Sequence, residues 1–363
     1  MSKNFLNMHV LISHSPSCLN RDDMNMQKSA IFGGKRRVRV SSQSLKRAIR
    51  TSDYYSEKLG APSIRTRELT TLKDVAVQAL GDEFEQDVVI TAIEWIAGKE
   101  GIAVEEGVQA SAMAPWAISE IAEICKAIVT GRQEGLDDKK LQKQIEKSSQ
   151  QFKAVFESAV DIALSGRMAT SGLMTNVDGA LAVAHAITTH SVDADIDWFT
   201  AVDDLIVDEG EMGAGHLNTQ EFSSGVFYRY ASLNIGQLQK NLGDCSRQKA
   251  LEVARHFIHL FATVVPSAKQ QTFAAHNLAD TVLLSFADQP LSLANAFETP
   301  VKADANGGFR QPSSKALLDH HAQLVQAYGL EEESRLFTLL NLESEVETAA
   351  GMIELGEWVL AQE

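Results

Sequence analysis

The order of periodic segments along the chain constrains its fold most strongly. A strand is predicted over residues 4–13, because successive side chains there alternate between two faces. A helix is predicted over residues 43–50, where Ser41 and Ser42 precede it as N-caps. Later segments follow in this order: a helical insertion over 68–164, a loop from 165, an Ala-rich stretch over 177–189 that fits strand or helix, an acidic and Gly-rich excursion over 203–215, a strand over 222–234, a helix over 247–264, a strand over 281–286 and a helical tail from 313. This order predicts an α+β fold with a ferredoxin-like or RRM-type sheet and two helices on one face.

The composition is that of a globular protein without a membrane segment. With 363 residues and 44% hydrophobic content, the chain can bury one elaborated core or two smaller ones. No run approaches the ~18 apolar residues of a membrane helix, so we expect a cytoplasmic protein. Cys18, Cys125 and Cys245 are odd in number and far apart, which predicts reduced thiols rather than disulfides or a zinc site. No metal or cofactor is predicted.

A basic segment interrupts this acidic chain. The formal charge is −15, yet the stretch between Met24 and Ser52 contains eight Lys or Arg residues and no Asp or Glu. Removing those eight from the 33 basic residues leaves 25 against 48 acids, so the rest of the chain sums to −23. A cationic strip that persists in an anionic protein indicates a binding site for an anion such as nucleic acid.

The basic segment combines features that suit phosphate. Gly33 and Gly34 precede a run of cations that includes Lys35 and Arg36, and the capped helix follows. Backbone amides, a Gln amide, a Lys ammonium and an Arg guanidinium together can reach phosphate oxygens from several directions. The spacing of Gln43, Lys46 and Arg50 places all three on one stripe of the helix. The alternative is a merely solvated basic face, and the glycine spacing does not match a Walker loop.

Apolar side chains in polar segments are candidates for contact with bases. Met168, Trp198, Phe199 and Leu217 each lie among turn-forming or polar residues. Such side chains can wedge between bases or support an unstacked one. The alternative reading, which is the more common one for a single apolar residue, is ordinary core.

A group of acids and histidines offers a possible catalytic site. Asp193, Asp195 and Asp197 alternate, and His185 and His190 lie just upstream. Carboxylates that share one face of a strand could hold Mg²⁺ or act as general acid and base. A polar loop edge is the favoured interpretation, because no EF-hand, HExxH, paired CxxC or nucleophile-elbow motif accompanies them.

A second basic stripe lies in the helical insertion. Lys139, Lys140, Lys143 and Lys147 recur at helical spacing. Such a stripe is usually a solvated face, but it can also contact a nucleic-acid backbone without reading sequence.

Several sequence blocks resemble one known family. The blocks are His-Val-Leu-Ile-Ser-His-Ser-Pro-Ser-Cys-Leu-Asn-Arg-Asp-Asp from His9, Phe-Gly-Gly-Lys-Arg-Arg-Val-Arg from Phe32, Ser-Ser-Gln-Ser-Leu-Lys-Arg from Ser41, Leu-Ser-Gly-Arg-Met-Ala-Thr-Ser-Gly from Leu164, Asp-Ile-Asp-Trp-Phe-Thr-Ala-Val-Asp-Asp from Asp195 and Thr-Gln-Glu-Phe-Ser-Ser-Gly-Val-Phe-Tyr-Arg-Tyr from Thr219. They resemble the CasC family, the backbone subunits of the type I-E CRISPR surveillance complex Cascade. The resemblance extends from the first strand to about Phe297.

The resemblance implies an architecture and a set of partners. Copies would line up head to tail along one CRISPR RNA guide, with other Cascade subunits and a target DNA strand as further partners. The implied parts are an RRM-like palm over 1–60 plus 223–312, mainly helical fingers over 61–191, a projecting β-rich thumb over 192–226 and a helical tail over 313–363 packed on the palm. The thumb would fold over the guide segment of the neighbouring copy and displace one base at regular intervals.

The resemblance also assigns roles to residues. Guide contacts would fall on Arg21, Lys28, Ser41, Gln43, Lys46 and Arg50. The basic segment adds Lys35 and Arg36 to this RNA-binding set, and the loop from 165 adds Arg167. Met168, Phe199 and Leu217 would form the base-displacing wedge, and Lys139, Lys140, Lys143 and Lys147 would contact the DNA backbone.

The sequence therefore favours a non-catalytic RNA-binding scaffold in which the guide, not the protein, carries sequence specificity. The alternative is a metal-dependent phosphodiesterase that processes RNA with Asp193, Asp195, Asp197 or the nearby histidines. A third and weaker reading is a free-standing single-strand binder.

Overall fold

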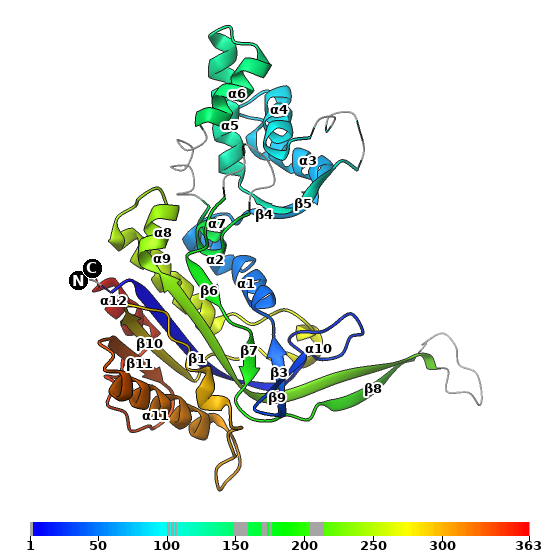
Figure 1. Cartoon of the computed structure of the whole chain (residues 1–363). Coiled ribbons are helices and arrows are strands. Elements are labelled where there is room, and N and C mark those ends of the chain that lie inside the picture. Colours follow the sequence, from blue (N-terminus) through cyan, green and yellow to red (C-terminus); the bar gives the residue numbers. More distant parts are fainter. Residues whose placement is uncertain are drawn as a thin grey trace. The chain divides into compact units, whose positions relative to one another are not determined.

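The first predicted strand is confirmed as β1 (Phe5–Ser17) in the computed structural model, where it pairs in an antiparallel sheet (Figure 1). The structure describes residues 3–99, 102, 105, 107–148, 159–168, 173, 176–202 and 214–362. Within these ranges the sheet has the order β11-β10-β1-β9-β7-β3-β2, and β6 and β8 also pair with β9. The other strands are β2 (Ser29–Phe32), β3 (Lys35–Val40), β6 (Leu181–Val183), β7 (Ala186–Thr188), β8 (Asp195–Val202), β9 (Ala214–Asn234), β10 (Thr281–Ala287) and β11 (Glu333–Thr338). The α+β class is as predicted.

The chain divides into two compact units. Unit 1 comprises Met1–Ser52, Val183–Ser232 and Phe257–Val359, and unit 2 comprises Asp53–Ala182, Leu233–His256 and Leu360–Glu363. Unit 1 contains nearly all of the sheet, whereas unit 2 is mainly helical.

Both faces of the sheet in unit 1 are buried. Leu11 of β1 packs with Leu283 and Leu317 in one cluster, whereas Ile12 packs with Val38 and Leu45 in another. Successive residues of a strand point to opposite faces, so these clusters lie on the two sides of the sheet. Burial on both sides explains why all seven residues of β10 are buried.

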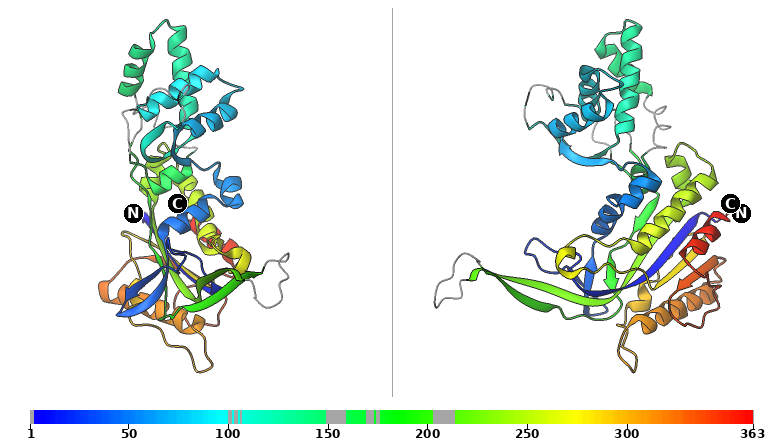
Figure 2. Two further views of the ribbon diagram at one scale, coloured as in Figure 1. Left: turned by 90° about the vertical axis from the view of Figure 1, so that its right-hand side faces the viewer. Right: turned by 180° about the vertical axis from the view of Figure 1, so that it is seen from behind.

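Helices cover the two faces of this sheet (Figure 2). Helix α1 (Ser42–Arg50) covers one face through Leu45. Helix α9 (Arg247–Thr263) ends on the same face, because Arg229 follows Phe227 at spacing two and donates to the Phe261 and Val264 carbonyls. The opposite face is covered by α11 (Arg310–Tyr328) and a 3-10 turn, η2 (Ala294–Phe297). The remaining helices of this part are α10 (Gln270–Phe273) and α12 (Met352–Leu360).

The structure settles one element that the sequence left open and differs from the prediction in others. The stretch predicted over 177–189 as strand or helix contains two short strands, β6 and β7. Strand β9 begins at Ala214, eight residues before the predicted start, because it pairs with β8 in a long hairpin. The tail is not wholly helical, since β11 pairs with β10 at the edge of the sheet. A hydrophobic run such as Leu336 and its neighbours fits either period when it is short.

Unit 2 is built on helices and one two-stranded ribbon. The elements are α2 (Asp53–Leu59), β4 (Ile64–Glu68), α3 (Leu69–Leu80), α4 (Gln86–Ala97), β5 (Gln109–Trp116), α5 (Ile118–Gln133), α6 (Asp138–Ser148), α7 (Val160–Ser165) and α8 (Ile235–Asn241). The apolar sides of the ribbon and of helices α3 to α6 meet in one cluster that includes Leu72, Ile93, Trp116, Ile124 and Leu141. Among the helices of the described residues, none is both long and apolar enough to cross a membrane.

Candidate nucleic-acid interface

The basic segment begins with the hairpin of β2 and β3. Its turn places Gly33 and Gly34 in left-handed backbone conformations, with φ of +58° and +68°. A Cβ on Gly33 would lie 1.7 Å from the Glu298 carbonyl oxygen, whereas one on Gly34 would meet nothing within 4 Å. Glycine at 33 is therefore required by close packing within unit 1, which is a structural role rather than a phosphate-binding one.

Arg37 of this hairpin belongs to the core. Its guanidinium is buried and donates to the carbonyl oxygens of Thr188, Phe297 and Glu298 at 2.9 to 3.1 Å. The side chain therefore fastens the hairpin to β7 and to the turn after η2. One of the eight cations of the segment is thus unavailable to a ligand.

Arg36 is partly neutralised. Its guanidinium lies 3.4 Å from a carboxylate oxygen of Glu221, and that carboxylate also accepts from the backbone amide of Gln27 at 3.0 Å. Arg36 keeps 40% of its side chain exposed, so it can still face a ligand beside this acid. Lys35, which was predicted with it, is exposed at the hairpin turn.

The start of α1 confirms the predicted N-cap. The Ser41 hydroxyl accepts from the Ser44 amide at 3.2 Å, and the Ser41 amide donates to the Asn20 side chain at 2.8 Å. The Ser42 amide donates to Nδ1 of His185 at 2.9 Å. The amides of Ser42 and Ser44 are therefore already bonded, which corrects the expectation that these two are open to phosphate oxygens.

The predicted stripe lies on α1. Gln43 is exposed, and Lys46 and Arg50 are half-buried on the same side of the helix, about 100° around it from the buried Leu45 and Ile49. The last turn also carries Arg47, which is exposed. Cations near the C-terminal end of a helix are favoured by the dipole, so the cations are both stabilised and presented here.

Arg21 and Lys28 lie in the segment between β1 and β2, just before the basic hairpin. Arg21 donates to the Asn25 side chain at 2.7 Å and forms an isolated bridge with Gln27. The Lys28 amide donates to the Asn20 carbonyl at 2.9 Å. Asn20 thus joins the Lys28 backbone to the Ser41 backbone through its two oxygens, a positioning role that its sequence context did not indicate.

Lys269 is a further cation that the sequence did not single out. Burial raises the pKa of the Cys18 thiol, and the positive charges of Arg21 and Lys269 oppose that shift, so both cations lie within electrostatic reach of Cys18. Lys269 is far away in sequence and has a left-handed backbone with φ of +56°. Only the tertiary fold brings it toward Arg21.

His185 lies among these cations as a neutral acceptor. Burial lowers the pKa of His185, and the charges of Arg39 and Lys28 lower it further. A neutral ring is what the Ser42 amide requires, since Nδ1 must accept. His185 is therefore a positioning residue for α1 in this arrangement.

The second basic stripe is exposed on α6. Lys139, Lys140, Lys143 and Lys147 are all exposed, and Leu141 and Ile145 form the buried side of the helix. Lys140 is paired with Asp137 at 3.2 Å but remains 77% exposed. The arrangement fits a surface contact with a polyanion and equally a solvated face.

Arg167 has a structural explanation. Its side chain is fully buried and forms a bidentate ion pair with Glu120, at 2.6 and 2.8 Å. Both groups belong to unit 2. The guanidinium is therefore occupied, which corrects the expectation that Arg167 is available to RNA phosphate.

The three wedge residues lie in different settings. Met168 is 87% exposed next to Arg167. In the hairpin of β8 and β9, Phe199 is opposite Asn218 and Thr200 is opposite Leu217, so the two predicted positions lie at the same level. Their side chains lie outside the described part of the structure. The described portion of this hairpin extends beyond the rest of the sheet (Figure 2).

The acids and histidines of the alternative site do not converge. Asp193, Asp195 and Asp197 are exposed at or before β8. His190 is buried, stacks on the Phe309 ring at 3.6 Å and contacts the Val226 amide at 3.3 Å. Across the described residues, no group of three or more His, Cys, Asp or Glu side chains lies close enough to hold a metal ion.

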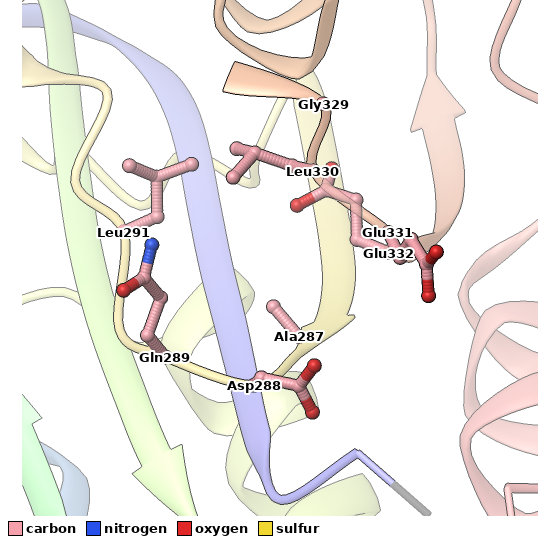
Figure 3. A pocket seen from close by; sticks show the side chains of 8 residues that line it. All are labelled: Ala287, Asp288, Gln289, Leu291, Gly329, Leu330, Glu331 and Glu332. Carbon is pink, nitrogen blue, oxygen red and sulfur yellow. The ribbon is translucent and has the colours of Figure 1, made fainter. Parts of the chain in front are cut away.

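A pocket at another edge of unit 1 has the wrong charge for a phosphate site (Figure 3). Its volume is about 290 Å³, and it lies between the end of β10 and the turn after α11. Asp288, Glu331 and Glu332 line it together with apolar and neutral groups, and no cation does. The cationic region around α1 is therefore the better candidate for an anionic ligand.

Comparison with known proteins assigns the chain to a family. The family model of the CT1975-like proteins matches residues 6–359. The chain belongs to the CT1975-like family. This CT1975-like chain is 30% identical to a chain in a solved structure of a CRISPR RNA-guided surveillance complex, pre-nicking, with a TM-score of 0.80, covering 98% of this chain and 99% of that chain. A chain of another CRISPR RNA-guided surveillance complex is 26% identical with a TM-score of 0.63 and the same coverage. No curated protein matches.

The matches cover both units of the CT1975-like chain. Because 98% of the chain is aligned, the α1 region and the α6 stripe both lie within the shared fold. The CT1975-like chain is therefore homologous to subunits of RNA-guided surveillance complexes along its whole length.

Proposed function

We propose that this protein is a non-catalytic backbone subunit of a Cascade-type CRISPR complex of type I-E, which binds the guide RNA in the cytoplasm. Unit 1 would act as an RRM-like palm that holds the guide, and the hairpin of β8 and β9 would act as the thumb. Copies assemble head to tail along the guide, with other subunits at the ends, and present guide bases to a target DNA strand.

The observation that carries the proposal is the placement of the cations in unit 1. Lys46 and Arg50 lie on one stripe of α1, and Asn20 ties the backbone of Lys28 to the start of that helix. Arg21 and Lys269 both act on Cys18, close to Asn20 in sequence. Cations on and near α1, in a protein with a charge of −15, suit a phosphodiester chain.

The salt dependence of guide binding tests this proposal. If Lys46 and Arg50 each contact a phosphate, replacing either with Ala lowers the slope of log affinity against log salt by about 0.7. Lys315→Ala is the matched control, because Lys315 is an exposed cation of α11, on the opposite face of the sheet. An unchanged slope in Lys46→Ala and Arg50→Ala would remove both residues from the guide site.

The nuclease alternative has its own test. A phosphodiesterase that uses the acids of β8 would cleave bound RNA when Mg²⁺ is added, and Asp195→Ala would abolish that cleavage. The scaffold proposal expects intact RNA in both proteins over the same incubation.

A further inference from the structure

The ribbon of β4 and β5 in unit 2 has one buried and one outward face. On the buried face, Ala114 and Trp116 pack into the core of the unit, and Nε1 of Trp116 donates to the Thr66 carbonyl at 3.0 Å. Thr66 is opposite Ala114, so Arg65 and Arg67 alternate onto the outward face. Both arginines are exposed.

The two arginines are unusual for their surroundings. Residues 53–116 contain 12 acids and five basic residues, and two of those five are Arg65 and Arg67. Within the described residues, neither a hydrogen bond nor an ion pair engages the Arg67 side chain. Like charges two residues apart on one face of a strand repel each other, and an anion bound by both would relieve that repulsion.

Arg65 is held in place rather than neutralised. Its guanidinium lies 3.9 Å from Asp161, at the outer limit of an ion pair, and 37% of the side chain is exposed. The Asp161 carboxylate is already bonded by the Ser63 amide at 3.1 Å and the Ser63 hydroxyl at 2.5 Å. Asp161 therefore orients Arg65 while leaving most of its donors free for a ligand.

The geometry of the ribbon matches a nucleic-acid strand. Residues two apart in a strand are separated by about 7 Å, which is close to the rise of two nucleotides along one strand of a duplex, so the two side chains match phosphates two nucleotides apart. Arginine forms bidentate bonds with phosphate oxygens. Met113 precedes the inward-facing Ala114 on β5, so it alternates onto the outward face, and it is 69% exposed. A flexible apolar side chain on this face can lie against a sugar or base.

We propose that the outward face of this ribbon is a second nucleic-acid site, in which Arg65 and Arg67 bind two phosphates that lie two nucleotides apart on a polynucleotide backbone. The inference rests on the proposed function, because it assigns a further contact to the same ribonucleoprotein. It differs from the α1 region and from the α6 stripe, which lies on another element of unit 2 (Figure 1).

The test uses the assembled complex with its guide and partner subunits. The variants are Arg67→Ala and Arg65→Ala/Arg67→Ala, and the control is Lys99→Ala/Lys126→Ala, which removes the same charge from exposed positions of unit 2. Two readouts are compared over a salt series: guide RNA retained per protein, and affinity for a matched DNA target. Arg67→Ala is the decisive single change, because Arg65 also contacts Asp161 and its loss can affect folding.

The two readouts identify the source of the phosphates. If the ligand is target DNA, guide content stays constant and the double variant lowers the salt slope of DNA binding by about 1.8 per contacting copy. If the ligand is the guide, the double variant retains less RNA than the wild-type complex as salt rises, and its salt slope of guide binding is lower by about 1.4 per copy. Either result supports the ribbon site, provided that the lysine control matches wild type.

One result overturns the ribbon site without touching the proposed function. If the wild-type complex binds guide and target, and the folded arginine variants do so with unchanged slopes, Arg65 and Arg67 are surface residues only. A wild-type protein that binds no guide would instead remove the proposed function.

Discussion

At the residue scale, the basic residues divide into those that hold the fold and those that face solvent. Arg37 and Arg167 were both parts of basic or binding segments in the sequence, yet both are buried and bonded to groups of the protein itself. Lys46 and Arg50 remain on the accessible side of α1. Charge in a sequence therefore points to a candidate segment, while burial decides which of its members can meet a ligand.

Arg167→Ala provides the stability test of this division. Removing one partner of a buried ion pair leaves the Glu120 carboxylate without compensation, which costs about 3 kcal/mol of unfolding free energy. Arg132→Ala is the control in the same unit, because its partners Asp87 and Asp138 are at least half exposed and the expected cost is about 1 kcal/mol or less. Chemical denaturation measures both. Equal losses would contradict the structural role of Arg167.

The sequence could reveal local relations but not these distant ones. The N-cap at Ser41 and the strand at β1 were predictable because their signals lie within a few residues. Arg36 and Glu221 are 185 positions apart, and Arg37 reaches carbonyls up to 261 positions away. Nothing in the local pattern shows that an acid or a carbonyl will be adjacent, so the occupied cations had to be found in the structure.

At the element scale, the hairpin of β2 and β3 is fixed by a glycine in a tight approach. Gly33→Ala should destabilise the protein more than Gly34→Ala. Both positions have left-handed backbones, which cost an alanine about 1 kcal/mol, but only the Cβ at 33 would collide with the Glu298 carbonyl. Thermal unfolding of the two variants measures the difference. Equal melting temperatures would show that the hairpin does not depend on this contact.

The edge of the sheet illustrates why some elements escaped prediction. The stretch around Leu336 was predicted as part of the helical tail, because a short apolar run fits the periodicity of a helix or of a strand. In the structure this stretch pairs with β10 and forms strand β11. Strand β9 likewise begins before the strand predicted from residue 222, since cross-strand pairing with β8, rather than local composition, extends it to Ala214.

At the scale of the whole molecule, buried histidines couple stability to pH. Burial lowers the pKa of His9 to about 3 and that of His14 to about 3, with His321 adding to the first shift and Arg229 to the second. An unfolded histidine takes up a proton near pH 6.5, whereas these two stay neutral in the fold. Their contribution is therefore intact above pH 6.5 and is lost as pH falls toward 3.

The size of this effect can be measured between pH 6 and 5, where carboxylates contribute little. Each histidine that is protonated only in the unfolded state lowers the free energy of unfolding by about 1.4 kcal/mol per pH unit. His9→Gln should therefore lower the slope of unfolding free energy against pH by the contribution of one histidine. His276→Gln is the control, since His276 lies in an exposed setting, and a profile that does not change in His9→Gln would contradict the neutral buried ring.

The central claim is that α1 and its surroundings hold a guide RNA, and the RNA that accompanies the purified protein tests it most directly. Wild-type protein expressed with its partner subunits and guide should contain RNA of uniform length, protected from nuclease at regular intervals. Lys46→Ala/Arg50→Ala should lose most of that RNA while Lys315→Ala retains it. Protein that is free of RNA and captures no guide even at low ionic strength with its partners present would contradict the account.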